Sequence, residues 1–250
     1  SPGALLERPA IRHPPPPRTP PLRPTCIAGP LDVRMRVRVS AFSSNASFPG
    51  TYGRRASAFE RVAFDAAMDA CGKWGGDPAT LRSVFATQSA DAEAVDRMMR
   101  GVALDPPLVS PLTFLQSVAC TLAGNWAART CSHASSTTLT AGPHSLGAAL
   151  LEGAVTVAAD ESTCLVVLCE VPPPAPLAMP GHTTTPIALA LVLTHGPGPG
   201  RLLDVRPGSG NCPGLPPEAV VAQLRTLIDG PAGTQLTVPT GKRTSIALQV

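Results

Sequence analysis

A short segment in the middle of the chain combines residue types that could perform nucleophilic chemistry. Thr140–Gly147, T-A-G-P-H-S-L-G, contains a serine with a histidine before it and a glycine two residues after it. A serine on a sharp turn between a strand and a helix can attack a carbonyl carbon when a base activates it. Ser145 is therefore the first candidate for a catalytic residue.

The flanking residues fit that chemistry incompletely. A serine nucleophile elbow has the pattern G-x-S-x-G, and Pro143 occupies the first glycine position here. An acid and a histidine must follow in the chain, and Asp160 with His182 or His195 provides them formally. The alternative interpretation places the serine in the first turn of a helix, where its hydroxyl satisfies free backbone N–H groups. His144 is then a polar loop residue.

The cysteines form no metal or redox motif. The seven lie at positions 26, 71, 120, 131, 164, 169 and 212, without C-x-x-C or Cys/His ligand spacing. The first thirty residues hold ten prolines and lack the apolar stretch of a secretory leader. Buried, reduced thiols in a cytoplasmic protein are therefore expected, with no metal and no cofactor.

Charge and hydropathy argue against two classes of partner. Residues 1–40 hold seven of the twenty basic residues and two of the seventeen acidic ones. The rest of the chain has thirteen basic against fifteen acidic residues and few aromatics, so it lacks the basic stripe with interleaved aromatics typical of nucleic-acid binding. No stretch approaches about 18 uninterrupted apolar residues, so no membrane-spanning helix is expected. The proline-rich residues 1–32 lack hydrophobic periodicity, which predicts a disordered arm.

Hydrophobic periodicity predicts alternating strands and helices after this arm. Strands are expected at 32–42, 81–87, 135–141, 163–171, 185–194 and 201–207, and helices at 57–72, 90–102, 110–130, 145–159 and 216–230. Ser57 and Glu60 make a capping box for the first helix, which Gly72 can end. The buried face of the second helix is expected to consist of Val95, Met98, Met99 and Val102.

This order of elements predicts a layered α/β fold of the βαβαβαββ type with a mostly parallel sheet. The two adjacent strands within 163–194 suggest an antiparallel pair at one side. We expect one domain over residues 33–198, with residues 199–250 as a strand–helix–strand extension packed on it.

From Met35 to about His195 the chain resembles the N-terminal half of the β-ketoacyl synthases, which have the thiolase fold. The residues that carry this are LVSPLTFLQSVACTLAGNWAARTCSHASSTTLTAGPHSLGAALLEGAV and the closing TPIALALVLT. The chain looks most like the short β-ketoacyl-synthase-like proteins that serve as chain length factors in aryl polyene and related pigment clusters. In synthases a small Ala-Gly pair precedes a strand, and T-A-C-S-S-S follows on the elbow. Ala123-Gly124 and Thr140–Ser145 match these two features.

The resemblance implies an elbow made of Thr140, Ala141, Gly142, Pro143, His144 and Ser145. Gly142 stands where the synthases have their nucleophilic cysteine, and a bulky replacement of Gly142 is expected to overfill a tight site. Active synthases also use two histidines from a C-terminal half, for which this sequence has no room. The resemblance therefore implies a non-catalytic, thiolase-like half rather than an enzyme on its own.

The resemblance also implies partners. An active β-ketoacyl synthase is expected, and an acyl carrier protein is a second candidate. Residues 112–140 would form the contact, in particular Ala119, Ala123, Gly124, Asn125, Trp126, Thr138 and Thr140. The small residues fit equally well with packing of helix on sheet within one chain. Two rival functions stay open: a serine acyltransferase or thioesterase that uses Ser145, and a stand-alone module that binds an acyl chain or a carrier protein.

Overall fold

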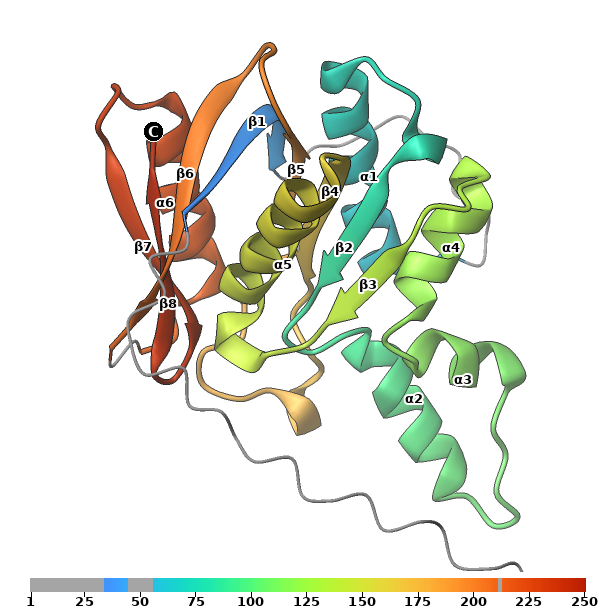
Figure 1. The fold of residues 1–250 in the computed structure, drawn as a ribbon. Coiled ribbons are helices and arrows are strands. Elements are labelled where there is room, and N and C mark those ends of the chain that lie inside the picture. Colours follow the sequence, from blue (N-terminus) through green and yellow to red (C-terminus); the bar gives the residue numbers. More distant parts are fainter. Residues whose placement is uncertain (1–33, 45–55, 211–212) are drawn as a thin grey trace, which may run out of the picture. The chain divides into compact units, whose positions relative to one another are not determined.

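A computed structural model describes residues 34–44, 56–210 and 213–250, all within the unit from Asp32 to Val250. The predicted arm, residues 1–32, lies outside the described residues. The elements of the described part (Figure 1) are β1 (Met35–Ser44), α1 (Ala58–Trp74), β2 (Arg82–Ala86), α2 (Ala92–Val102), α3 (Pro111–Ser117), α4 (Thr121–Thr130), β3 (Ser136–Leu139), α5 (Ser145–Asp160), β4 (Thr163–Glu170), β5 (Ile187–Thr194), β6 (Arg201–Ser209), α6 (Pro217–Asp229), β7 (Gln235–Gly241) and β8 (Thr244–Gln249).

The described strands form one sheet in the order β3-β2-β4-β5-β1-β6-β8-β7. β2 pairs in parallel with β3 and β4, whereas the remaining neighbours pair antiparallel. The layered α/β class is confirmed. The predicted antiparallel pair is β4 and β5, but it lies in the middle of the sheet and not at one side. The predicted predominance of parallel pairing is wrong. Parallel neighbours need a crossover. The crossover through α2, α3 and α4 places β3 beside β2, and the crossover through α5 places β4 on the other side of β2, so the parallel pairs are confined to these three strands.

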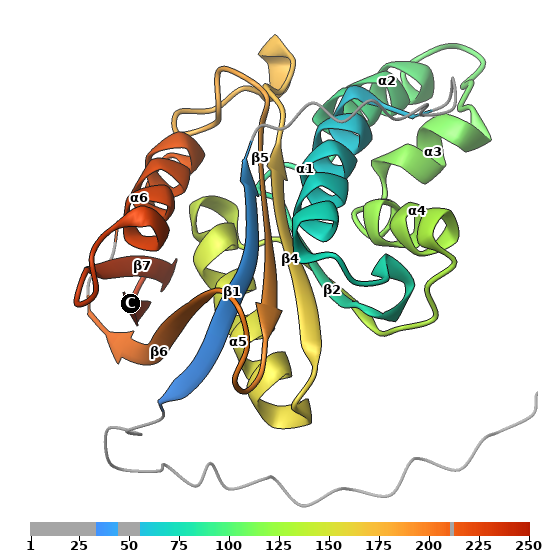
Figure 2. The same cartoon turned by 90° about the horizontal axis from the view of Figure 1, so that it is seen from above.

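Helices cover both faces of the sheet, as Figure 2 shows from above. α1 and α4 lie on one face, where their apolar side chains pack with Phe85, Leu165 and Val167. α5 and α6 lie on the other face and pack with strands that include β1, β4 and β5. β4 and β5 are buried on both faces, which explains their nearly continuous apolar sequences.

The first helix begins as predicted but ends later. The Ser57 hydroxyl accepts a hydrogen bond from the Glu60 N–H, and the Glu60 carboxylate accepts one from the Ser57 N–H, so the capping box is confirmed. The helix continues past Gly72 to Trp74, and Gly75, with φ +80, ends it. Gly75 adopts this left-handed backbone at no steric cost, so the predicted end at Gly72 is wrong.

Two expectations for residues 90–130 are also wrong. The predicted helix 110–130 is interrupted at Val118, whose backbone is extended, and becomes α3 and α4. The face of α2 expected to be buried is largely open, with Met99 57% and Val102 50% exposed. The reason is that α2 packs against α3 and lies away from the sheet, so no strand covers this face (Figure 1).

Candidate functional site

The segment between β3 and α5 forms a sharp elbow at the carboxyl end of β3. After Leu139 a short 3-10 turn, Gly142–His144, leads into α5. Gly142 has φ +55, in the left-handed region, whereas Ser145 has helical backbone angles of −56° and −40°. The left-handed position of the elbow is therefore Gly142, which is the position that the resemblance assigns to a nucleophile.

The space beside the Gly142 Cα, where a side chain would begin, is open. It has no side chain, and a Cβ built there would meet no atom within 4 Å. The expectation of a tight site that a bulky residue overfills is therefore wrong. The constraint at Gly142 comes from its backbone, because a left-handed conformation costs other residues roughly 1–2 kcal/mol.

The Ser145 hydroxyl is engaged in hydrogen bonds that hold the elbow together. It accepts a hydrogen bond from the Ala141 N–H at 3.0 Å. It lies 3.0 Å from the Thr87 carbonyl oxygen and 2.8 Å from the Gly142 carbonyl oxygen, either of which can accept its proton. With 2% of its surface exposed, Ser145 is closed to a substrate. These contacts favour the interpretation that Ser145 lies in the first turn of the helix and bonds backbone groups, over the interpretation that it is a nucleophile.

The candidate triad partners do not gather around Ser145. Asp160 ends α5 and pairs with Arg82 at the amino end of β2, whereas the elbow follows the carboxyl end of the parallel strand β3. His195 follows β5, whose last residue pairs with the first residue of β4, so it also lies at the amino end of β2 and β4, away from the elbow. The Nδ1 of His182 accepts a hydrogen bond from the Met179 N–H within its own loop. No histidine in the described part of the chain is hydrogen-bonded to Ser145.

Segments from the last forty residues pack directly onto the elbow. A Cβ at Gly214 would lie 2.4 Å from the Pro143 Cβ, and a Cβ at Gly147 would lie 2.0 Å from the Pro239 carbonyl oxygen. His144, expected as a loop residue, is 9% exposed, and its Nδ1 lacks a hydrogen-bond partner among the described residues. The C-terminal segments therefore contact the turn at Pro143, which stays exposed, and pack closely against Gly147 in the first turns of α5.

Beneath the elbow lies an acidic residue that sequence reasoning missed. Glu170, the last residue of β4, is 2% exposed. Its carboxylate accepts hydrogen bonds from the Gln88 N–H and, at 3.4 Å, from the Thr87 hydroxyl. Burial raises the pKa of Glu170 from 4.5 to about 7, although these hydrogen bonds oppose the shift. Its signal in the sequence was a lone carboxylate that ends the apolar run TCLVVLCE.

The residues predicted to contact a partner have different environments. Gly124 is exposed on α4, and Ala119 is exposed in the turn that precedes it. Thr138 lies on the edge strand β3, and Thr140 follows this strand. Ala123 is 7% exposed, so it serves packing within the chain.

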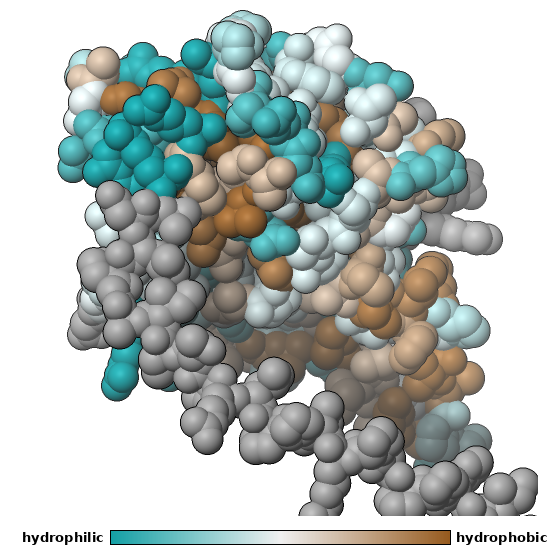
Figure 3. All heavy atoms as spheres, viewed as in Figure 1, coloured by the Kyte–Doolittle hydropathy of each residue, from teal (hydrophilic) through white to brown (hydrophobic). Residues whose placement is uncertain are grey.

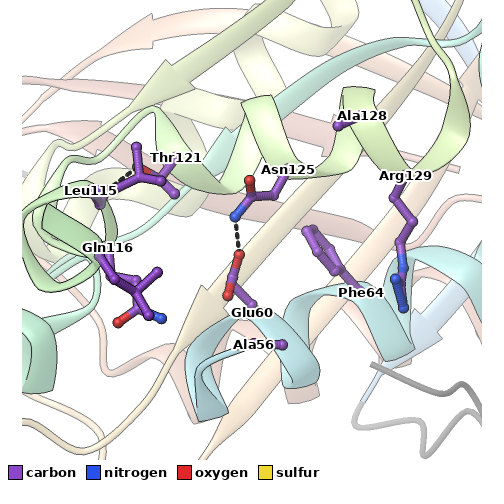
Figure 4. A pocket seen from close by; sticks show the side chains of 10 residues that line it. Ala56, Glu60, Phe64, Leu115, Gln116, Thr121, Asn125, Ala128 and Arg129 are labelled. Atoms are coloured by element: carbon purple, nitrogen blue, oxygen red, sulfur yellow. Dashed lines mark hydrogen bonds between the residues drawn. The ribbon is translucent and has the colours of Figure 1, made fainter. Parts of the chain in front are cut away.

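Two further members of that set point inward. Trp126 is 1% exposed and packs against Phe64 and Phe85, so its side chain supports the surface from beneath. Asn125 donates a hydrogen bond to the buried Glu60 carboxylate, which fixes α4 against α1 (Figure 4). Internal packing therefore accounts for Ala123, Asn125 and Trp126, whereas the exposed residues of the segment remain predicted contacts.

A large apolar surface lies over α2 and α3. We call it the α2–α3 surface, and Figure 3 shows it as brown spheres at the lower right. It consists of Met99, Val102, Leu104, Leu108, Val109, Leu112, Phe114, Leu115 and Val118, each between 38% and 71% exposed. Contiguous apolar surface of this kind marks interaction sites on folded proteins.

An open cleft of about 450 Å³ adjoins this surface (Figure 4). Leu112 and Leu115 of α3 form one wall, and Phe64 of α1 with Arg129 of α4 forms another. The Arg129 guanidinium lies 5.9 Å from the centre of the Phe64 ring. The lining of the cleft is therefore mixed, because Glu60, Asn125 and Arg129 also line it.

The described cysteines offer no thiol at the elbow. Burial raises the pKa values of Cys71 and Cys164 to about 12 and also raises that of Cys169. Cys120 and Cys131, at the two ends of α4, are exposed, so the expectation of uniformly buried thiols is wrong for them. Cys26 and Cys212 lie outside the described residues. Within residues 34–44, 56–210 and 213–250, no cluster of side chains is suited to hold a metal, and no helix is long and apolar enough to cross a membrane.

Comparison with known proteins decides the family. Residues 40–210 match the model of the β-ketoacyl synthase N-terminal domain. The chain belongs to this family. The predicted resemblance is thereby confirmed over more than half of the sequence. A search of curated proteins found no match.

Solved structures show the thiolase-like fold of this β-ketoacyl synthase family member. A chain of a ketosynthase (ApeO) in complex with its chain length factor (ApeC) from Xenorhabdus doucetiae aligns with 19% identity and a TM-score of 0.67, covering 86% of this chain and 100% of that chain. The ishigamide ketosynthase/chain length factor aligns with 14% identity and a TM-score of 0.57, covering 77% and 72%. A type II polyketide ketosynthase complex with its acyl carrier protein, AntDE:AntF, aligns with 13% identity and a TM-score of 0.50, and the chain spans 58% of its length.

Proposed function

We propose that the protein is a non-catalytic β-ketoacyl synthase subunit, a chain length factor that pairs with an active ketosynthase. The observation that carries this proposal is Gly142, which has no side chain at the left-handed position of the elbow. A ketosynthase acylates a cysteine thiolate activated at a helix N-terminus. None of the described cysteines lies at this position of the elbow. The chain therefore has the backbone geometry of the elbow but lacks the nucleophile.

The free edge of β3 is well suited to pair with another chain. The Ser83 and Thr87 N–H groups donate to the Ser135 and Leu139 carbonyls, so the odd-numbered residues of β3 face β2. The backbone groups of Thr138 therefore point away from the sheet, because they alternate along a strand. β3 is the last strand of the sheet on this side, and an unpaired edge is a template for strand addition.

The α2–α3 surface offers further apolar area to a partner chain. Among its charged neighbours on α2, Arg97 pairs with Glu93 and Arg100 pairs with Asp96. A surface whose charges are paired within the chain suits an apolar protein face better than an anionic membrane. The proposed contact thus comprises residues 112–140, in which the outward backbone groups of Thr138 would pair with a strand of the partner. It also includes the exposed end of α2.

The second partner, the product and the location in this proposal are inferred from the family resemblance and from the similar solved structures. A ketosynthase accompanied by a chain length factor, and another accompanied by an acyl carrier protein, are among the structures that this chain resembles. We therefore assign an acyl carrier protein as the second partner, aryl polyene or a related polyketide as the product, and the cytoplasm as the location. Residues 33–198 form the ketosynthase-like domain in this proposal, and residues 199–250 form its extension.

The two rivals have less support from the contacts. A serine acyltransferase or thioesterase needs Ser145 accessible beside a base, whereas it is buried and bonded to backbone groups. A stand-alone binding module has no need of an unpaired edge or of the α2–α3 surface. The cleft beside Phe64 is the feature that favours such a module, because it could hold part of an acyl chain.

Co-expression with an active ketosynthase tests the proposal. The pair is expected to elute together on size exclusion, and Thr138→Pro is expected to abolish co-elution, because proline removes the outward N–H donor. Thr138→Val keeps that donor and is the matched control, which should still co-elute. A wild-type chain that stays a folded monomer beside the ketosynthase would overturn the proposal.

A further inference from the structure

Thr87 lies at the end of β2, where four segments meet beneath the elbow. Its N–H donates to the Leu139 carbonyl of β3, and its carbonyl accepts from the Ser145 hydroxyl. Its own hydroxyl faces the Glu170 carboxylate at 3.4 Å and accepts from the Ala90 N–H at 2.9 Å. The loop from Thr87 to Ala90 is therefore fastened to β3, β4 and α5 at once.

Glu170 is the titratable member of this junction. Its carboxylate accepts from the Gln88 N–H and from the Thr87 hydroxyl, whose oxygen in turn accepts from the Ser89 and Ala90 N–H groups. These bonds tie the end of β4 to the loop that leads into α2. Within the described part of the chain, no basic side chain is bonded to this carboxylate.

The charged and titratable groups around Glu170 are acidic or neutral. Glu218, at the start of α6, raises the pKa of Glu170 through repulsion. Asp91, at the start of α2, is itself buried and accepts from the Ala94 N–H. The Cys169 thiol, next to it on β4, is kept neutral by burial. A negative charge on Glu170 therefore has hydrogen bonds to stabilise it and no cation.

The loop is also strained. Ala90 has φ +53, a left-handed backbone that costs a residue with a side chain roughly 1–2 kcal/mol. Its N–H bond to Thr87 and the helix that follows hold it in this conformation. Release of the loop would relieve both the backbone strain and the burial of the carboxylate.

We propose that Glu170 is a protonation-sensitive latch on the β2–α2 loop: protonated, it keeps residues 87–90 closed beneath the elbow, and ionised, it favours a local opening that exposes its carboxylate to water. The protonated acid still accepts from the Gln88 N–H through its carbonyl oxygen and has no charge to bury. The latch depends on contacts within this chain, so it stands independently of the proposed partner.

The direction of the effect follows from proton linkage. The closed state holds the proton up to about pH 7, whereas a solvated glutamate releases it near 4.5. An opening that exposes Glu170 therefore becomes more favourable as the pH rises between these values, by about tenfold per pH unit for one proton. Above that window the opening constant no longer depends on pH.

Amide hydrogen exchange of the full chain, measured between about pH 5 and pH 8, tests the latch. Rates for residues 86–91 are divided by the intrinsic exchange rates, which gives the opening constant. For the wild type we expect a rise of about tenfold per pH unit up to about pH 7, then a plateau. For Glu170→Gln, which cannot ionise, we expect no dependence on pH. Asp229→Asn, at an exposed carboxylate on α6, should behave as the wild type.

A flat wild-type profile, or the same slope in Glu170→Gln, would overturn the latch. If Glu170→Gln does not fold, the isotope-labelled Glu170 carboxyl of the wild-type chain is titrated directly by NMR. A midpoint near 7 supports the latch, and a midpoint near 4.5 overturns it. Glu218→Gln provides a second check, because loss of its repulsion lowers the closed-state pKa of Glu170, so the rise in the opening constant should level off at a lower pH.

Discussion

The hydroxyl of Ser145 lies 3.0 Å from the carbonyl oxygen of Thr87, fifty-eight positions earlier in the chain. This contact joins the first turn of α5 to the end of β2. It also accounts for a serine that, from its sequence context, could be taken for a nucleophile. The position with the left-handed backbone is Gly142, a residue without a side chain that could act as a nucleophile.

We expect Ser145→Ala to lower stability without removing a function. The change takes away a buried hydroxyl and leaves the Ala141 N–H without its partner, which costs roughly 1–3 kcal/mol. Urea unfolding measures this loss. The variant should still co-elute with a ketosynthase, and the wild type should resist labelling by a fluorophosphonate. Stoichiometric labelling of Ser145 would instead support the hydrolase rival.

Gly142→Ala is expected to destabilise the chain by roughly 1–2 kcal/mol, because alanine must adopt a left-handed backbone at φ +55. Gly72→Ala is the matched control. A Cβ there also meets nothing within 4 Å, but Gly72 has helical backbone within α1, where alanine is favoured by about 1 kcal/mol. Thermal unfolding should therefore move in opposite directions for the two variants. Equal shifts would contradict the assignment of strain to Gly142.

Local patterns predicted much of the fold, because they act over a few residues. The capping box at Ser57 and Glu60, the apolar runs of β4 and β5 and the amphipathic α6 could each be identified from their own sequence. The pairing direction of the strands could not, since it depends on which strands become neighbours. The face of α2 was misassigned for the same kind of reason: Met99 and Val102 have helical spacing, but nothing in that spacing says whether another element lies opposite.

The same distinction between local patterns and contacts of distant segments applies to the candidate site. Gly142 was found because it interrupts a motif, and a motif is visible in the sequence. Thr87 and Glu170 were missed because they come from the ends of two strands that are eighty-three positions apart. Only the parallel pairing of β2 with β4 brings them together. Trp126 was assigned to a contact surface from its neighbours, although its ring packs with Phe64 and Phe85 inside the chain.

Replacement of exposed apolar residues on the α2–α3 surface should change solubility rather than stability. Leu108 and Phe114 are 71% and 58% exposed, so the double variant Leu108→Ser, Phe114→Ser should unfold within about 0.5 kcal/mol of the wild type. Light scattering should show less self-association, and co-elution with the ketosynthase should weaken. Trp126→Ala is the contrasting variant, with an expected loss of roughly 3–5 kcal/mol from the core.

Thiol labelling should separate the described cysteines into two groups. Cys120 and Cys131 are exposed and should react with iodoacetamide within minutes at neutral pH. Cys71, Cys164 and Cys169 are buried with raised pKa values, so both access and thiolate formation are suppressed. Peptide mass spectrometry of the labelled native chain reads out each site. Rapid labelling of Cys164 in folded protein would contradict its placement in the core.

Global stability should fall as the pH rises from about 4.5 to about 7. The folded chain keeps a proton on Glu170 in this window, because burial raises its pKa to about 7, whereas the unfolded chain has released it. The stability associated with that proton is fully present at the low end of the window and is lost as the pH passes the folded pKa. The hydrogen bond from Arg34 lowers the pKa of Asp204, so its contribution is lost only in stronger acid and does not offset this trend. Urea unfolding at about pH 5 and at pH 8 measures the difference, and Glu170→Gln should reduce it. A wild type more stable at pH 8 than at pH 5, with the same difference in the variant, would show that Glu170 does not hold its proton in the folded chain.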